Sequence, residues 1–265
     1  MRYISHCDGK EALAVTRRTL QSPQRRIVIS SGAFIVLAAL VATPARSDIV
    51  FSIYLGASQT KPSDLRVVQD SRGNDATMHN VPWQGYPFRF EPYYGLRLTY
   101  NPPGHPWTRV AIDFTHYKIY GRTEDSVTQD GRWHGDALSD VGPMRERVQS
   151  FEMTHGLNML GVSVLQNVTP SIKGVYVGGG PVLYFPHSEN RVDALPDGDR
   201  YNFGGFGFQL HAGARTCAGS RGIYGELKYN EGHPTVSIAQ GYAQTTVQTI
   251  HELAGFDFGP CRSSP

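Results

Sequence analysis

Three histidines, His116, His155 and His187, each stand near the end of a segment in which apolar residues alternate with small or polar ones. Imidazole changes its charge near neutral pH, so these side chains can act as general acids, general bases or metal ligands. Each histidine continues the apolar parity of its segment, which places all three on one face of a sheet if the segments are strands. A single histidine at such a place is more often an ordinary interfacial residue, whereas three on neighbouring strands favour a catalytic or metal site.

Two charged residues share this parity. Glu189 follows His187 by two residues and is a candidate carboxylate ligand or base. Lys118 follows His116 by two residues and is a candidate contact for a phosphate group, although a solvated lysine has the same pattern. We therefore assign His116, His155, His187 and Glu189 as candidate catalytic residues and Lys118 as a candidate substrate contact.

Glu152 and His155 need separate treatment because of their spacing. Residues three apart share one face of a helix, where Glu-x-x-His is half of a di-iron motif, but they face opposite sides of a strand. The sequence thus predicts Glu152 on the opposite face from His155, unless the strand begins after it. A second familiar motif is also missing, since the glycines at 178–180 lack the helix that a phosphate-binding loop requires.

The elements that position these residues are eight predicted strands. Each shows period-two alternation and is rich in Val, Ile, Tyr and Phe. They are expected at 50–57, 93–100, 109–118, 151–165, 172–185, 203–215, 222–230 and 247–258.

The lengths of the connections distinguish a membrane barrel from a soluble sheet, because apolar and polar residues alternate along the strands of both. The links at 101–108, 166–171 and 216–221 are short, whereas the other links are longer and polar. This alternation over an even number of strands is typical of an outer-membrane barrel with short periplasmic turns and long extracellular loops. We predict an all-β, eight-stranded antiparallel up-and-down transmembrane barrel. Its polar parity then fills a narrow interior without a pore: Arg97, Asp113, Glu152, Arg215, Glu226, Lys228 and Asp257.

Composition excludes several other classes of protein. The net charge of +2 argues against nucleic-acid binding. Disorder is excluded because only 18% of the 265 residues are charged and 11% are aromatic. A mean hydropathy of -0.34 with one long apolar run excludes a bundle of several membrane helices.

That apolar run, at 27–42, follows two pairs of arginines and precedes small residues. It predicts a signal peptide over residues 1–47, with a single barrel domain over 48–265; an uncleaved anchor helix is the alternative. Two cysteines then remain, Cys217 and Cys261, both at the periplasmic rim of the predicted barrel, which makes a disulfide plausible. Phe256 and Phe258 give the last strand the aromatic ending that barrel-assembly machinery recognises.

Several strings resemble the lipid A oxidase family of rhizobial outer membranes. They are DFTHYKIY at 113–120, FEMTHGLN at 151–158, YVGGG at 176–180 and PHSE at 186–189, with PYYGLR at 92–97 and ELKY at 226–229. The resemblance covers roughly residues 53–229, but the segment 121–149 and the chain after Asn230 do not share it. It implies an enzyme of the Gram-negative outer membrane that uses molecular oxygen to oxidise the proximal glucosamine of lipid A to an aminogluconate unit.

Oxygen as the oxidant implies a metal or an organic cofactor. A set of histidines with a carboxylate suits iron, and manganese fits as well, so His116, His155 and His187 are candidate metal ligands. The expected partners are lipid A in lipopolysaccharide, the outer membrane and its barrel-assembly machinery, for a monomeric protein. Two alternatives stay open: a non-enzymatic barrel that anchors the envelope or binds ligands through its loops, and a lipid A hydrolase. A hydrolase needs a serine beside a rim histidine, and Ser188 adjoins His187 but faces the opposite way in an extended strand.

Overall fold

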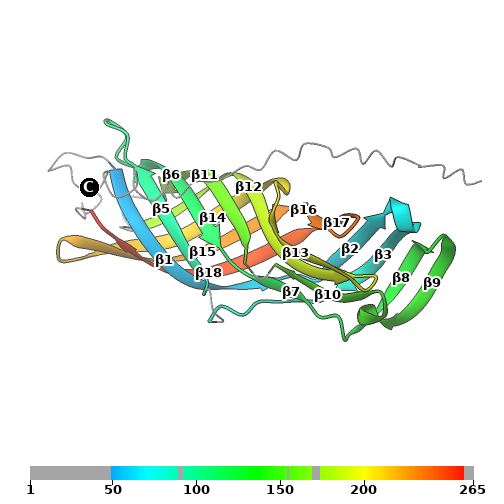
Figure 1. The fold of residues 1–265 in the computed structure, drawn as a ribbon. Helices are drawn as coiled ribbons and strands as arrows, with labels where there is room; N and C mark the ends of the chain where they lie inside the picture. The colour runs from blue at the N-terminus through cyan, green and yellow to red at the C-terminus, as the bar shows by residue number, and fades with distance from the viewer. Residues whose placement is uncertain (1–48, 89–91, 154, 169–173, 260–265) are drawn as a thin grey trace, which may run out of the picture. The chain divides into compact units, whose positions relative to one another are not determined.

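Eight strands close into a barrel in the computed structural model, which describes residues 49–88, 92–153, 155–168 and 174–259 (Figure 1). Each strand pairs antiparallel with the next barrel strand along the chain, and pairing of the last with the first closes the ring. The barrel strands are β1 (Ile49–Thr60), β5 (Tyr94–Tyr100), β6 (Thr108–His116), β11 (Leu157–Asn167), β12 (Val175–Val192), β14 (Gly205–Ala218), β15 (Arg221–Gly232) and β18 (Val247–Asp257). The predicted eight-stranded, antiparallel, up-and-down barrel is confirmed.

The connections alternate in length as the sequence predicts. Short ones join β5 to β6, β11 to β12 and β14 to β15 at one end of the barrel, which we call the short-turn end. The other four lie at the opposite, long-connection end and were expected to be polar loops. In the described residues they instead contain ten further strands: β2 (Ser63–Gln69), β3 (Asn74–Val81), β4 (Trp83–Gln84), β7 (Ile119–Gly121), β8 (Ser126–Trp133), β9 (Asp136–Pro143), β10 (Val148–Met153), β13 (Leu195–Tyr201), β16 (Thr235–Ile238) and β17 (Gly241–Thr245).

Six of these strands form a second sheet in the order β16-β17-β2-β3-β8-β9. Leu65, Val67 and Met78 of this sheet are fully buried, which explains why the connections fold rather than remain loops. β12 runs beyond the barrel and pairs there with β10 and with β13. The long-connection end is therefore an ordered β-structure continuous with the barrel wall.

The carboxylate of Asp193 joins three hairpin turns at this end. It lies at the tip of the β12–β13 hairpin, where it accepts a hydrogen bond from Arg72 of the β2–β3 turn. It also lies 2.8 Å from Nε2 of His134 in the β8–β9 turn. Because the β12–β13 hairpin carries His187 and Glu189, this contact helps to fix the position of two candidate site residues.

The interior of the barrel holds a network of buried, paired charges. Arg97 donates to Glu226 at 2.8 Å and to Asp113 at 3.0 Å, and Lys228 donates to Asp113 at 2.9 Å. At most 4% of each of these residues is exposed, and buried charges are tolerated when each has an opposite partner. Six of the seven charged residues predicted for the interior lie there.

The seventh residue, Glu152, does not lie in the barrel interior, contrary to the prediction. It lies on β10, outside the eight barrel strands. The sequence predicts a single strand at 151–165, which joins β10 to β11 and extends the alternation of one into the other. The physical reason for the break is Gly156, which has a positive φ of 98° between the two strands.

The outer wall of the barrel is apolar. Ile112 of β6, Val162 of β11, and Leu210 and Phe206 of β14 are 48%, 46%, 51% and 69% exposed. An apolar wall around a paired polar interior is the arrangement of a transmembrane barrel and the reverse of a soluble sandwich. Among the described residues, no helix is long and apolar enough to cross a membrane. The predicted signal peptide, residues 1–47, lies outside the described residues.

Glu252 provides a test of this assignment, because it is an exposed carboxylate on the outer wall. It lies midway along β18, between Ala57 of β1 and Leu227 of β15. A carboxylate facing hydrocarbon is unfavourable, so Glu252→Leu should raise the free energy of unfolding in lipid bilayers by about 1–2 kcal/mol. Urea titration in bilayers measures this change. Destabilisation by Glu252→Leu would show that this part of the wall does not face lipid.

His79 predicts a pH dependence in the six-stranded sheet. Its Nε2 lies 3.0 Å from Asp130 and its Nδ1 3.1 Å from Asp64, and these two carboxylates raise the pKa of His79 above its usual value. The imidazolium therefore stabilises the sheet fully below about pH 6.5, and this contribution is lost as the pH rises through the raised pKa. Titration of the His79 ring signals by NMR should show the raised pKa, and Asp130→Asn should lower it; an unchanged pKa in that variant would contradict the assignment.

Candidate functional site

His116 and His187 occupy the outer face of the barrel wall at its long-connection end, as their parity predicts. His116 ends β6, with its ring stacked on Tyr94 of β5 at 4.9 Å between centroids. His187 lies on β12, with its ring parallel to that of Tyr201 on β13 at 4.0 Å. Both histidines are buried by these aromatic neighbours, at 4% and 6% exposure, rather than standing open at the rim.

Gly156 brings the two buried histidines together. Its carbonyl accepts the backbone N–H of His187 at 3.0 Å. A Cβ on this glycine would lie 2.4 Å from Nδ1 of His116, so no other residue fits without moving that ring. The same Nδ1 lies 2.8 Å from the side-chain oxygen of Asn158, which is opposite His116 in the β6–β11 register. The start of β11 therefore fixes His116 through both Gly156 and Asn158.

His155 and Glu189 form the accessible part of the site. Nε2 of His155 lies 3.2 Å from Oε1 of Glu189, and their side chains are 40% and 48% exposed. The ring of His155 also contacts that of His187, with 4.7 Å between centroids. We call His155, His187 and Glu189 the histidine cluster; it joins residues that are more than thirty positions apart in the sequence.

His155 lies near His187, as predicted, but the prediction that it continues the apolar alternation of a strand is wrong. His155 lies in the turn between β10 and β11, not on a continuous strand. Beyond the break the odd positions Leu157 and Met159 are buried, and Leu160 is 40% exposed, so the apolar outer parity is even, contrary to the sequence interpretation. Asn158 consequently faces outward, where it meets His116.

Glu152 is the residue that the sequence argument set aside. In the β10–β12 register it pairs directly with Glu189, so their side chains leave the same face of the sheet. Directly opposed residues have their Cβ atoms about 5 Å apart, and like charges so placed oppose each other. The site thus contains two neighbouring carboxylates, Glu152 and Glu189, and the second of them lies beside His155.

Lys118 is less accessible than its proposed role requires. It follows the end of β6 and is only 7% exposed, so it is not a solvated rim lysine. Phosphate binding by Lys118 stays a prediction. It would first require a rearrangement that exposes the Lys118 side chain.

The three histidines do not form the predicted set of metal ligands. Within the part of the chain that the structure describes, no three His, Cys, Asp or Glu side chains are arranged to hold a metal ion. Nδ1 of His116 is already engaged by the side-chain oxygen of Asn158. We therefore derive no catalytic step through a metal.

Cys217 is disulfide-bonded. Cys261 lies outside the described residues, so the pairing of Cys217 with Cys261 stays a prediction.

The arrangement can exchange protons with a bound molecule. An imidazole beside a carboxylate is oriented by it, and the imidazolium that forms on protonation is stabilised by it. His155 and Glu189 are both accessible, whereas His187 is buried and its ring stacks on that of Tyr201, which is itself 62% exposed. General acid–base chemistry is thus what the described side chains support.

Comparisons with known proteins give a likeness of fold only. No family model matches the chain, and no curated protein matches it. Among solved structures, the outer membrane protease OmpT from Escherichia coli is similar with a TM-score of 0.34 and 11% identity, over 83% of this chain and 99% of OmpT.

Gly156→Ala tests how the site is held. The substitution adds a Cβ at positive φ and against His116, so it should lower the free energy of unfolding by about 1–3 kcal/mol and shift the His116 ring signals in NMR spectra. Gly104→Ala is the matched control, because Gly104 also has a positive φ, of 76°, but no atom within 4 Å of the added Cβ. Equal effects of the two variants would show that the contact with His116 is unimportant.

Proposed function

We propose that this protein is a Gram-negative outer-membrane enzyme that modifies lipid A, by oxygen-dependent oxidation of the proximal glucosamine to an aminogluconate unit. The observation that carries the proposal is the accessible pair of His155 and Glu189 on the outer side of the barrel, at the boundary between its apolar wall and its polar end. The oxidation itself is implied by the family resemblance of the strings around His116, His155 and His187.

The surroundings of the histidine cluster fit an amphiphilic substrate. Phe185 of β12 packs against Phe203 at 5.8 Å, and Phe203 packs against Phe206 at 5.2 Å. Phe203 and Phe206 are 53% and 69% exposed, and Phe185 precedes His187 by two residues on the same face of β12. Aromatic residues mark the membrane interface in such barrels. Acyl chains would therefore lie along this apolar wall, and the sugar headgroup would lie at the level of His155 and Glu189.

The chain's own residues supply the proton transfer of the proposed reaction. His155 takes the proton of the anomeric hydroxyl, and Glu189 orients the ring and stabilises its charge. Two electrons and the hydrogen on the anomeric carbon pass to molecular oxygen, which also receives the proton held by His155, so the products are a lactone and hydrogen peroxide. Addition of water opens the lactone, so the lipid gains one oxygen atom overall. The oxygen requirement and an iron or manganese cofactor stay predictions of the resemblance.

The hydrolase alternative has less support. Ser188 faces away from the histidine cluster, and its hydroxyl donates to the backbone carbonyl of Ser237 at 3.4 Å. A serine nucleophile must lie within reach of its base, and Ser188 does not share the face of His187.

Mass spectrometry of lipid A tests the proposal. The full chain is expressed in a Gram-negative host that lacks the activity and whose lipid A carries a free anomeric hydroxyl on the proximal glucosamine, and the extracted lipid A should gain the mass of one oxygen. His155→Ala should abolish the gain, and Glu189→Gln should reduce it by about 10²-fold or more, the usual effect of losing an acid–base group. His105→Ala, an exposed histidine at the short-turn end, should leave the gain unchanged.

Other outcomes separate the alternatives. Loss of an acyl chain would indicate a hydrolase, and an unchanged mass with a correctly assembled barrel would indicate a non-enzymatic protein. Glu152→Gln, compared with Glu146→Gln in the same connection, then shows whether the second carboxylate takes part. Retained activity in His155→Ala would remove this residue from the site.

A further inference from the structure

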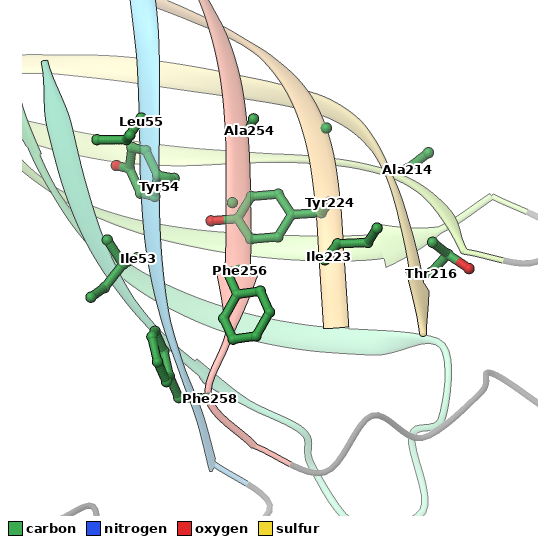
Figure 2. A pocket seen from close by; sticks show the side chains of 12 residues that line it. Ile53, Tyr54, Leu55, Ala214, Thr216, Ile223, Tyr224, Ala254, Phe256 and Phe258 are labelled. Atoms are coloured by element: carbon green, nitrogen blue, oxygen red, sulfur yellow. The ribbon is translucent and has the colours of Figure 1, made fainter. Parts of the chain in front are cut away.

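A hollow on the outer wall is separate from the histidine cluster. Residues of β1, β14, β15 and β18 line it, whereas His187 and Glu189 lie on β12 and His155 lies in the turn before β11. The volume of the hollow is about 680 Å³. Figure 2 shows Ile53, Ile223 and Phe256 around its lower part, toward the short-turn end.

The floor of the hollow is a row of small residues set side by side by the strand register. Ala214 of β14 pairs with Gly225 of β15, and Gly225 pairs with Ala254 of β18. The nearest atom to a Cβ built on Gly225 is 4.0 Å away, so this glycine leaves open space. Larger apolar side chains, Leu55 on β1 and Phe256 on β18, stand beside the row. The result is an apolar depression in a wall that is otherwise covered by large side chains.

A positive charge lies at the rim below the hollow. Arg221 begins β15 at the short-turn end, is exposed, and shares the outward parity of Ile223 and Gly225. Four residues of strand separate Arg221 from Gly225, which is about 13 Å. That length is close to the depth of one leaflet, about half of the 30 Å hydrocarbon core. A guanidinium at the rim is complementary to a phosphate at the headgroup level.

We propose that this hollow binds one acyl chain of a diacyl phospholipid, with the phosphate of the same lipid at Arg221. The apolar floor accepts the chain, the rim arginine pairs with the phosphate, and the distance between them suits a lipid of the leaflet at the short-turn end. The inference rests on the barrel spanning a membrane and does not depend on the reaction at the histidine cluster.

Filling the hollow tests the proposal. The full-length protein is purified in a mild detergent, supplied with phosphatidylglycerol, and examined by native mass spectrometry for retained lipid. Gly225→Leu should lower the retained fraction about tenfold, the effect of roughly two buried methylene groups. Val177→Leu, an outward substitution on β12, which does not line the hollow, is the matched control and should retain lipid as the wild type does. Migration of unheated and heated samples on gels confirms that each variant is folded.

The arginine provides a second, independent arm. Arg221→Gln should lower retention of phosphatidylglycerol while retention of uncharged diacylglycerol stays as in the wild type. Three results would overturn the proposal: unchanged retention in Gly225→Leu, an equal loss in Val177→Leu, or displacement of phosphatidylglycerol by an equal amount of purified lipid A. Because no arm measures enzymatic activity, failure here is distinct from failure of the proposed oxidation.

Discussion

The pairing of β1 with β18 is the constraint on which the rest of this structure depends. In hydrocarbon an unpaired backbone N–H or C=O has no water to bond, so a sheet can cross a membrane only when its edges meet. Closing eight strands leaves an interior that side chains fill. The buried pairs of Arg97 with Glu226 and Lys228 with Asp113 follow from this, because a charge in that interior is tolerated only beside its opposite.

Closure also explains where chemistry can occur. The interior is occupied by paired charges, and the wall must be apolar, so polar residues that face outward are tolerated at the ends of the strands. His187 and Glu189 lie on β12 where it leaves the barrel and pairs with β10 and β13. The site is thus held by the rigid wall on one side and by the extra strands on the other, while it stays open to a molecule in the membrane interface.

The sequence could predict the barrel from two patterns. Apolar and polar residues alternate along each strand, and short and long connections alternate along the chain, as they do in closed barrels. Strands such as β5 and β15 were placed within one or two residues, since each lies between a short turn and a long connection. The strands of the long connections were missed because they are short and their burial depends on partners elsewhere in the chain. Val67, for example, is buried in a sheet whose strands come from three separate connections.

The sequence predicts only those parts of the site that follow a local alternation. His187 continues the alternation of β12 and lies where the sequence predicts, but Glu152 lies on β10 and His155 lies in the following turn, which only the positive φ of Gly156 reveals. Glycine at that position carried no signal, since many glycines in this chain lie within strands. Register between β10 and β12, which sets Glu152 opposite Glu189, is likewise decided by tertiary pairing rather than by local pattern.

Oxygen uptake by the purified protein is the measurement that tests the central claim most directly. The protein is reconstituted in nanodiscs with lipid A, and dissolved oxygen is followed together with the mass of the lipid. The account predicts equimolar oxygen consumption and oxidised lipid A in the wild type, and neither in His155→Ala. Oxidised lipid A without oxygen uptake, or equal uptake in the two proteins, would contradict it.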